Sequence, residues 1–240
     1  MSDFKNENIW LMKGDCLERM KEIPDGSVDL VLTDPPYKMT KNGKSCRPNY
    51  MSTQRTDTLF SGQKLPNQLE YLKESYRVMG RGHLYLFTNV KMLTESLNNL
   101  EKAGFRLHNV ISMIKDTKMP NRWYLKYTEL VIVAFKGKAK AINDKTSRDY
   151  VNVIMPKTKD KLHITQKPYD FIEKLVTNST EEGDTVLDMF MGSGTTIKAA
   201  HNTKRKAIGI ELGYCEKEDH LYSGEHWVDV LVEELKLKEN

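Results

Sequence analysis

Cysteine is scarce in this chain, and long hydrophobic runs are missing. The three cysteines are widely spaced and odd in number, so a disulfide framework is excluded and a reducing, cytoplasmic location is expected. No Cys or His pair has the spacing of a zinc site, so no metal is expected. No apolar run approaches the roughly 20 residues that cross a bilayer. The N-terminal residues lack the basic and then apolar order of a secretion signal.

Charge is nearly balanced over the chain but unevenly distributed. The net charge is only +4, which by itself is weak support for a nucleic-acid partner. Residues 38–55 carry five basic side chains and no acid, and lysines are dense again from 136 to 161. Two long polar segments, 38–65 and 136–165, lack hydrophobic periodicity, and insertions of this length are usually functional or disordered. Solvated loops remain the alternative for both.

The hydrophobic pattern predicts an α/β fold. Seven apolar segments of strand length alternate with amphipathic helical stretches, which favours a largely parallel sheet in a medium-sized domain. No helix is evident between the fourth and fifth strand segments, so these two are expected to form an antiparallel pair. The predicted strands are 9–14, 28–33, 83–89, 107–114, 129–135, 185–190 and 207–212. The predicted helices lie near 15–22, 66–79, 91–103, 167–178, 195–203 and 214–236.

A glycine turn follows the sixth predicted strand, in the stretch VLDMFMGSGTT. The strand ends at Asp188, the glycines are Gly192 and Gly194, and a helix is expected to begin near Thr195. Backbone N–H groups at such a helix start can meet a ligand. A dinucleotide fingerprint needs a third glycine where Ile197 stands, so a nucleoside without phosphates fits better. About 20 residues on, Glu211 ends the next strand, where an acid can bind ribose hydroxyls.

The stretch TDPPY, residues 33–37, ends the second predicted strand in an acid, two prolines and an aromatic residue. Two prolines stop a helix and remove two backbone donors. The acid and the aromatic ring are therefore held on rigid backbone at the end of a strand. This arrangement contributes little to packing and is typical of a functional site.

DPPY at 34–37 together with DMFMGSGTT at 188–196 resembles the S-adenosylmethionine-dependent amino-methyltransferases of DNA. Since the tetrapeptide precedes the glycine motif, the order resembles the circularly permuted beta group. GDCLERM, HITQKP and GIEL fit the same group. The resemblance implies a Rossmann-like methyltransferase fold: a mixed, mostly parallel seven-stranded sheet with an antiparallel hairpin and helices on both faces. Residues 1–240 would form a single catalytic domain, with inserts at 38–65 and about 115–162.

The resemblance also implies a mechanism for the tetrapeptide. The side chain of Asp34 and the carbonyl of Pro35 would accept hydrogen bonds from the two N–H groups of an exocyclic base amine. The lone pair of the amine nitrogen could then attack the sulfonium methyl. Pro35 and Pro36 would fix this backbone in advance, and Tyr37 would stack on the base. Because the amine is inaccessible inside a duplex, the base must be flipped out.

The same resemblance assigns residues to S-adenosyl-L-methionine. The glycine turn would hold its methionine part, Glu211 its ribose, Asp15 its adenine amine, and residues 165–167 would close over the methionine end. Capping of a helix is the alternative role for Asp15, Thr195 and Thr196, and Lys167 has the alternative of an ordinary first-turn residue. The expected cofactor-binding residues are Asp15, Asp34, Thr165, Lys167, Asp188, Phe190, Gly192, Ser193, Gly194, Thr195, Thr196 and Glu211.

The identity of the target base follows from weaker signals. Aspartate at the first position of the tetrapeptide favours adenine N6, while cytosine N4 suits the same clamp. Cytosine C5 chemistry is disfavoured because none of the cysteines follows a proline. An RNA or protein-glutamine methyltransferase is a rival enzyme, and a degenerate module that binds DNA or cofactor without turnover is a rival of another class.

DNA recognition is assigned to the two inserts, where basic and aromatic residues are interleaved. Packing of Trp123 and Tyr124 on the core is the alternative. Double-stranded DNA is the expected partner, without membrane contact. A homodimer and a cognate restriction endonuclease, as in restriction-modification systems, are further open alternatives. The expected DNA contacts are Lys38, Lys41, Lys44, Arg47, Lys115, Lys118, Arg122, Trp123 and Lys126.

Overall fold

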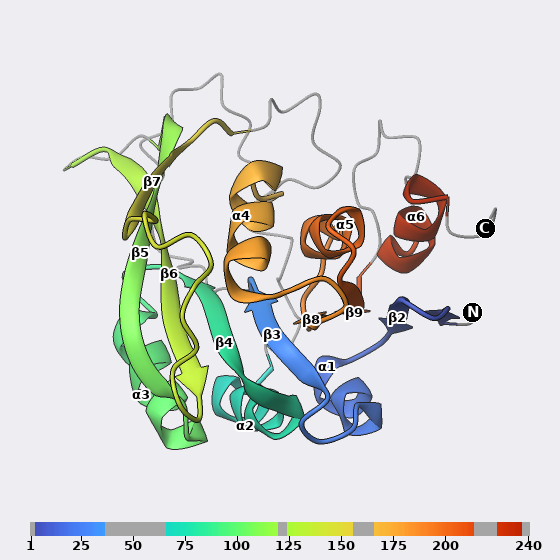
Figure 1. The fold of residues 1–240 in the computed structure, drawn as a ribbon. Helices are drawn as coiled ribbons and strands as arrows, with labels where there is room; N and C mark the ends of the chain where they lie inside the picture. The colour runs from blue at the N-terminus through green and yellow to red at the C-terminus, as the bar shows by residue number, and fades with distance from the viewer. Residues whose placement is uncertain (1–2, 37–65, 120–123, 156–165, 214–224, 237–240) are drawn as a thin grey trace.

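The computed structural model describes residues 3–36, 66–119, 124–155, 166–213 and 225–236. Within them lies one nine-stranded sheet with the order β1-β2-β9-β8-β3-β4-β6-β5-β7 (Figure 1). The strands are β1 (Phe4–Lys5), β2 (Ile9–Lys13), β3 (Val28–Thr33), β4 (Met79–Thr88), β5 (Arg106–Met119), β6 (Lys126–Lys136), β7 (Tyr150–Val153), β8 (Thr185–Asp188) and β9 (Lys206–Glu211). The helices are α1 (Cys16–Arg19), the 3-10 turn η1 (Met20–Glu22), α2 (Gln68–Val78), α3 (Leu93–Ala103), α4 (Tyr169–Ser179), α5 (Thr195–Asn202) and α6 (Trp227–Glu234).

The centre of the sheet is parallel. β3 lies between β8 and β4, and β9 lies between β8 and β2; all four of these pairings are parallel. The carboxyl ends of β3, β8 and β9 therefore meet at one edge of the sheet. Ligands of open α/β sheets bind outside the carboxyl ends of the strands. The residues that follow Thr33, Asp188 and Glu211 are thus brought to a common edge.

The other half of the sheet is mostly antiparallel. β6 pairs antiparallel with both β4 and β5, as expected for the two segments without a helix between them. Thr88, the last residue of β4, lies opposite Leu130, so that Glu129 lies just past the end of β4. The buried part of β6 therefore begins beside the carboxyl edge of the sheet, where β3 ends.

The expected sheet type is confirmed, but the expected number of strands, seven, is too low. The two additional strands are β1 and β7. β1 has only two residues, and β7 has four, with Tyr150 and Asn152 exposed. Both lie at the outer edges of the sheet, where one side of the strand has no neighbour. A short and half-exposed strand leaves no apolar run that could be detected in the sequence.

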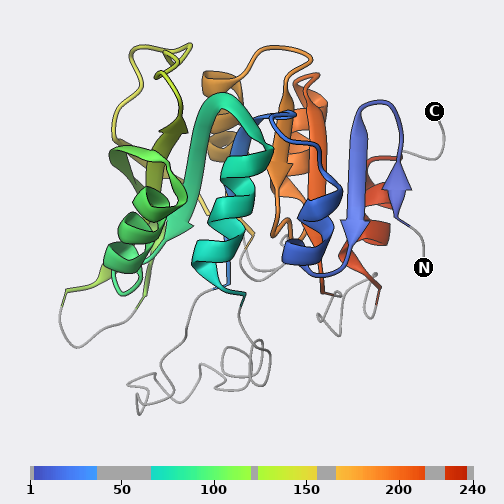
Figure 2. The same cartoon turned by 90° about the horizontal axis from the view of Figure 1, so that it is seen from below.

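Helices cover both faces of the sheet. Because successive side chains of a strand point to opposite faces, Leu30 and Leu32 of β3 contribute to one buried cluster and Val31 contributes to the other. The first cluster includes residues of α4, α5 and α6, and the second includes residues of α1, α2 and α3. Figure 2 shows the two sets of helices on opposite sides of the sheet.

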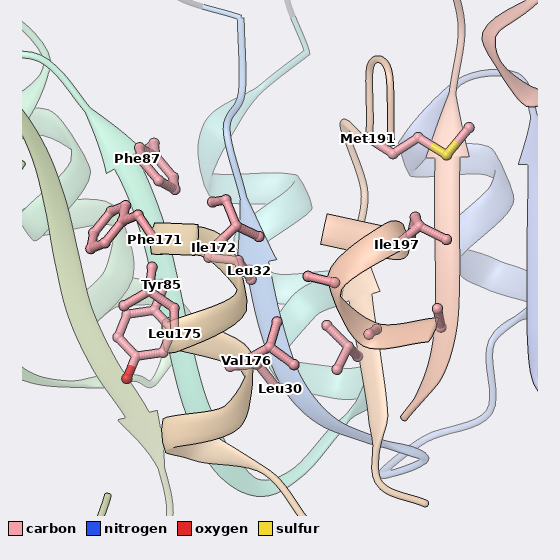
Figure 3. Packing of buried hydrophobic residues seen from close by; sticks show 14 of the residues in the cluster. Leu30, Leu32, Tyr85, Phe87, Phe171, Ile172, Leu175, Val176, Met191 and Ile197 are labelled. Atoms are coloured by element: carbon pink, nitrogen blue, oxygen red, sulfur yellow. The ribbon is translucent and has the colours of Figure 1, made fainter. Parts of the chain in front are cut away.

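The packing under α4 determines where the residues before this helix lie. Phe171, Ile172, Leu175 and Val176 of α4 are buried against the central strands (Figure 3). Burying side chains of this size stabilises a fold by about 1.5–3 kcal/mol each. The helix is thereby fixed on the sheet, and residues 166–168, which precede it, are held near the carboxyl edge.

Candidate active site

The two halves of the sequence motif are joined directly by a hydrogen bond. Thr33 Oγ1, at the end of β3, donates a hydrogen bond of 2.9 Å to Asp188 Oδ1, at the end of β8. Both side chains are buried. Asp34 follows Thr33 immediately and is half-buried. The first residue of DPPY therefore lies next to the start of the glycine turn, although the two aspartates are far apart in the chain.

Asp188 is a buried carboxyl group with several donors around it. Besides Thr33, the backbone N–H of Phe190 donates to Oδ1 at 3.1 Å, and Thr196 contributes a further side-chain hydrogen bond. Burial raises the pKa of Asp188 to about 7, while the hydrogen bonds act in the opposite direction. A carboxyl group in such a position favours a cationic partner, because a nearby positive charge would offset the cost of burying the ionised form.

The glycine turn leaves room for a ligand at one glycine and is closely packed at the other. Gly192 and Gly194 both adopt positive φ, 51° and 76°, which favours glycine. A Cβ on Gly192 would meet no atom within 4 Å, whereas a Cβ on Gly194 would lie 2.4 Å from Leu231. Gly192 therefore borders open space, and the structure fits a ligand that approaches the backbone there.

The start of α5 is built from small, buried polar residues. Its N-cap is Gly194, which makes no side-chain capping bond, and Ser193, Thr195 and Thr196 are buried. Neither threonine occupies the capping position, so the capping alternative does not describe them here. The hydrogen bond from Thr196 to Asp188 instead ties the helix start to the end of β8.

Glu211 holds the glycine turn in place. Its Oε2 accepts from the N–H of Gly192 at 2.8 Å and its Oε1 accepts from the N–H of Gly213 at 2.7 Å. Burial raises the pKa of Glu211, and the backbone donors partly offset this. Each carboxylate oxygen has two acceptor sites. Glu211 can therefore accept hydrogen bonds from ribose hydroxyls in addition to those from the two backbone N–H groups.

Asp15 acts as a helix cap in this structure. It is the N-cap of α1, and its Oδ1 accepts from the N–H of Leu17 at 2.9 Å. The preceding Gly14 N–H donates to the carbonyl of Glu211 at 2.9 Å, so Asp15 lies beside the end of β9. Its second carboxylate oxygen has acceptor capacity for a ligand amine.

Lys167 points to Asp34. The ammonium forms an ion pair with Asp34 and lies 3.4 Å from Glu129 Oε2, and it lies 5.0 Å from the centre of the Phe87 ring. Burial opposes the charged form, but the two carboxylates outweigh it and the pKa of Lys167 is raised. Glu129 was not among the residues expected from the sequence. Its only signal there is an acid at the first position of the predicted strand 129–135.

An aromatic pair flanks the glycine turn. The ring of Phe190 packs edge-on against Tyr71 of α2, with ring centroids 5.1 Å apart. Phe190 was expected from the sequence, but Tyr71 was not, because an aromatic residue on an amphipathic helix is normally a core residue. The contact fixes Phe190 beside the end of β8.

The remaining predicted site residues include the two prolines and the basic residues assigned to DNA. Pro35 is buried and Pro36 is half-buried at the end of β3, while Lys126 is exposed. Lys115 pairs with Glu129 at 2.9 Å, and only 10% of its side chain is exposed, so it faces the protein. Outside the described residues lie Tyr37, Lys38, Lys41, Lys44, Arg47, Arg122, Trp123 and Thr165; the side chain of Lys118 is also not described.

Neither a metal-ligand cluster nor a membrane-spanning helix is found in the described part of the chain. Among the described residues, no three His, Cys, Asp or Glu side chains come together as metal ligands would. In the same ranges, no helix has the length and apolar character needed to span a membrane.

The site agrees with comparisons to known proteins. The sequence model of a DNA methylase family, the N6 and N4 methyltransferases, matches residues 28–218. The type II methyltransferase M2.LlaDCHI of Lactococcus lactis subsp. cremoris is 30% identical, over 87% of this chain and 86% of its own length. The type II methyltransferase M.HinfI of Haemophilus influenzae is 29% identical, over 88% of this chain and 66% of its own length. The chain thus spans just under two thirds of M.HinfI.

Solved structures show the same architecture. The crystal structure of an M1.HpyAVI–SAM complex superimposes with a TM-score of 0.67 at 27% identity, covering 94% of this chain and 99% of that one. The cytosine-N4-specific PvuII DNA methyltransferase superimposes with a TM-score of 0.65, covering 97% of this chain and 94% of that one. Its identity is 18%, so it supports the fold alone.

A mixed sheet whose parallel centre joins an acidic strand end to a glycine turn at its carboxyl edge is a Rossmann-like fold with a site suited to a nucleoside. The chain belongs to the DNA methylase family of N6 and N4 amino-methyltransferases. This confirms the resemblance and S-adenosyl-L-methionine as the expected cofactor.

Proposed function

We propose that this chain is a site-specific DNA adenine N6-methyltransferase that acts on a flipped-out base in double-stranded DNA. The observation that carries the proposal is the hydrogen bond between Thr33 and Asp188, since it joins the strand end that displays Asp34 to the glycine turn. Family membership supports amino-methylation of DNA. The choice of adenine depends on aspartate as the first residue of the tetrapeptide.

The residues around the glycine turn fit the cofactor. Asp188 offers a buried carboxyl group for a cationic group, the open space at Gly192 admits a ligand to the backbone, and Glu211 can accept ribose hydroxyls. When bound, S-adenosyl-L-methionine supplies a methyl group whose bond to sulfur breaks as the bond to nitrogen forms, leaving the electron pair on sulfur. We assign Asp15 to the exocyclic amine of the cofactor's adenine and Phe190 to the wall of the cofactor site.

Asp34 and Pro35 then act on the target amine. The carboxylate of Asp34 and the carbonyl of Pro35 accept hydrogen bonds from the two N–H groups of this amine. These hydrogen bonds reduce the delocalisation of the nitrogen lone pair into the ring. The prolines hold these acceptors in place before the base arrives, so little reorganisation is needed. The nitrogen gains the methyl group and releases one proton. We assign Tyr37 to stacking on the base, which is worth roughly 1–3 kcal/mol.

The inserts and partners complete the proposal. We assign DNA recognition to residues 38–65 and about 115–162, with the chain acting as a single catalytic domain. The exposed Lys126 is suited to a phosphate contact. A second copy of the chain and a cognate restriction endonuclease are further proposed partners; the relatives named type II methyltransferases support the latter.

The test is to express the protein in a host that lacks adenine methylation and to map modified bases across the genome. N6-methyladenine at one short sequence is expected, and Asp34→Ala serves as the inactive control. Detection of N4-methylcytosine would instead identify cytosine as the target base. Cofactor binding without any modified DNA base would instead favour a degenerate module or another substrate.

A further inference from the structure

Glu129 occupies a position that the chemistry of the tetrapeptide does not explain. It lies just past the end of β4, at the edge where Asp34 follows the end of β3. Its side chain is 30% exposed, while the ammonium-bearing side chains of Lys115 and Lys167 are only 10% and 11% exposed. An acid on the surface of a sheet edge is ordinary, but one that contacts two largely buried lysines is not.

The four charged residues form a line in which the signs alternate. Lys115 contacts Glu129 Oε1 at 2.9 Å, Glu129 Oε2 lies 3.4 Å from the Lys167 ammonium, and this ammonium contacts Asp34. The line has no net charge. Removing one charge from a buried pair is costly because the other is left uncompensated. Each member therefore depends on its neighbours for its ionised state and its position.

Glu129 is the second carboxylate beside the Lys167 ammonium. A lysine side chain is flexible and would otherwise follow a single carboxylate through many rotamers. Here the ammonium is held between two carboxylates, with the Phe87 ring 5.0 Å away. Burial raises the pKa of Glu129, but the two lysines outweigh it and the net shift is downward, which agrees with an acid that stays ionised.

We propose that Glu129 is a positioning residue for methyl transfer, because it shares the Lys167 ammonium with Asp34 and so orients the carboxylate that accepts the target amine. The proposal rests on the proposed function of Asp34. Lys115 anchors the other oxygen of Glu129 and thereby connects the β5–β6 hairpin to the acceptor.

A simpler role for Glu129 is to neutralise the largely buried Lys115. The two roles differ in what removal of Lys115 does. If Glu129 only neutralises Lys115, Lys115→Met should restore the activity lost in Glu129→Gln. If Glu129 positions Lys167, the double variant should be as slow as Glu129→Gln, because the ammonium still lacks its second carboxylate.

The experiment compares wild type, Glu129→Gln and Lys115→Met/Glu129→Gln in single-turnover methylation of DNA, which isolates the chemical step from product release. The matched control is Glu182→Gln, which breaks the exposed ion pair with Lys204. Both residues precede their strands, β8 and β9, and so lie at the edge of the sheet opposite the site. We expect a rate about 10- to 100-fold lower in both Glu129 variants, the size of effect that misplacement of a reacting group produces. The Kd for the cofactor and the KM for DNA should stay unchanged, as should every parameter of the control.

The wild-type rate in Glu129→Gln, or its return in the double variant, would overturn the positioning role. If Glu129→Gln does not fold, Glu129→Asp replaces it: it keeps the charge but withdraws it by one methylene, and a wild-type rate would be equally decisive. A wild-type protein that methylates no DNA would refute the proposed function instead, so the two failures are distinguishable.

Discussion

Thr33 Oγ1 donates a hydrogen bond of 2.9 Å to Asp188 Oδ1, and both residues are buried at the carboxyl edge of the sheet. Residues 155 positions apart in the chain are thereby joined by one side-chain contact. The contact aligns β3 with β8 at the point where β3 leads into Asp34, the proposed acceptor for the target amine, and β8 leads into the glycine turn. Substitution of Thr33 or Asp188 should therefore affect both the proposed site for the target amine and the site for the cofactor.

Asp34→Ala should abolish methyl transfer and leave cofactor binding largely intact. Lys167 keeps Glu129 as a partner in this variant, although Lys115 and Lys167 then share this one carboxylate. We expect at least about a 100-fold loss of rate, as for other groups aimed at the reacting centre. Methyl incorporation and calorimetric titration with cofactor measure the two effects. Loss of cofactor affinity on the same scale as activity would contradict the proposed division of roles.

Thr33→Val should destabilise the fold without changing side-chain volume much. Removing the hydroxyl takes one donor from the buried Asp188, at a cost of about 1–3 kcal/mol in the free energy of unfolding. Urea denaturation at pH 8, where Asp188 is mostly ionised, measures this cost. Thr33→Ser keeps the hydroxyl and is the control. A valine variant as stable as the wild type would show that the hydrogen bond contributes nothing.

The buried Asp188 should make stability depend on pH. Its pKa is raised from 3.8 to about 7 on folding, so the folded state binds the proton more tightly than the unfolded state. The resulting stabilisation is fully present below about pH 4 and is lost as pH rises through 7, with a slope of up to about 1.4 kcal/mol per pH unit. Denaturation from pH 5 to 8 should show this fall.

Asp188→Asn is the comparison for this pH effect. The variant should lack the contribution of Asp188 and retain that of Glu211, whose pKa is shifted in the same direction. The difference between the two proteins therefore isolates Asp188. Parallel stability curves for wild type and variant would contradict the raised pKa.

The two glycines of the turn should respond differently to alanine. Gly194→Ala would place a Cβ 2.4 Å from Leu231 and should lower the free energy of unfolding by more than the roughly 1–2 kcal/mol that a left-handed residue costs. Gly192→Ala carries only that backbone cost but intrudes on the open space assigned to the cofactor. Its main effect should be a higher Kd for the cofactor, measured by titration. Equal losses of stability and equal affinities in both variants would refute the distinction.

The lysine and arginine residues assigned to DNA should be visible in salt dependence. Removing one side chain that binds a phosphate reduces the slope of log affinity against log salt by about one. Arg122→Ala and Lys126→Ala should therefore each flatten this slope, whereas Lys198→Ala, on α5 and paired with Glu234, should leave it unchanged. Fluorescence anisotropy on a duplex at several salt concentrations measures the slopes. Slopes that match wild type would remove Arg122 and Lys126 from the DNA interface.

Local sequence was sufficient for the elements with strong periodicity. The apolar runs that became β3, β8 and β9 end in Thr33, Asp188 and Glu211. The acids at or after these ends were recognised by their context: two prolines follow Asp34, a glycine turn follows Asp188, and Glu211 stands about 20 residues after that turn. The glycine turn was equally clear, since positive φ at Gly192 and Gly194 favours one residue type. β1 and β7 were missed because short edge strands bury too little to leave a pattern.

Order along the chain and residue type alone determined the family, the nucleoside character of the cofactor and the acid of the tetrapeptide, because these depend on which groups stand within a few residues of one another. Only the tertiary structure decided that Lys167 turns to Asp34, that Glu129 joins them, and that Tyr71 supports Phe190. These contacts bring together side chains from separate strands and helices. Their geometry is created by the packing of the sheet, which no local pattern in the sequence records.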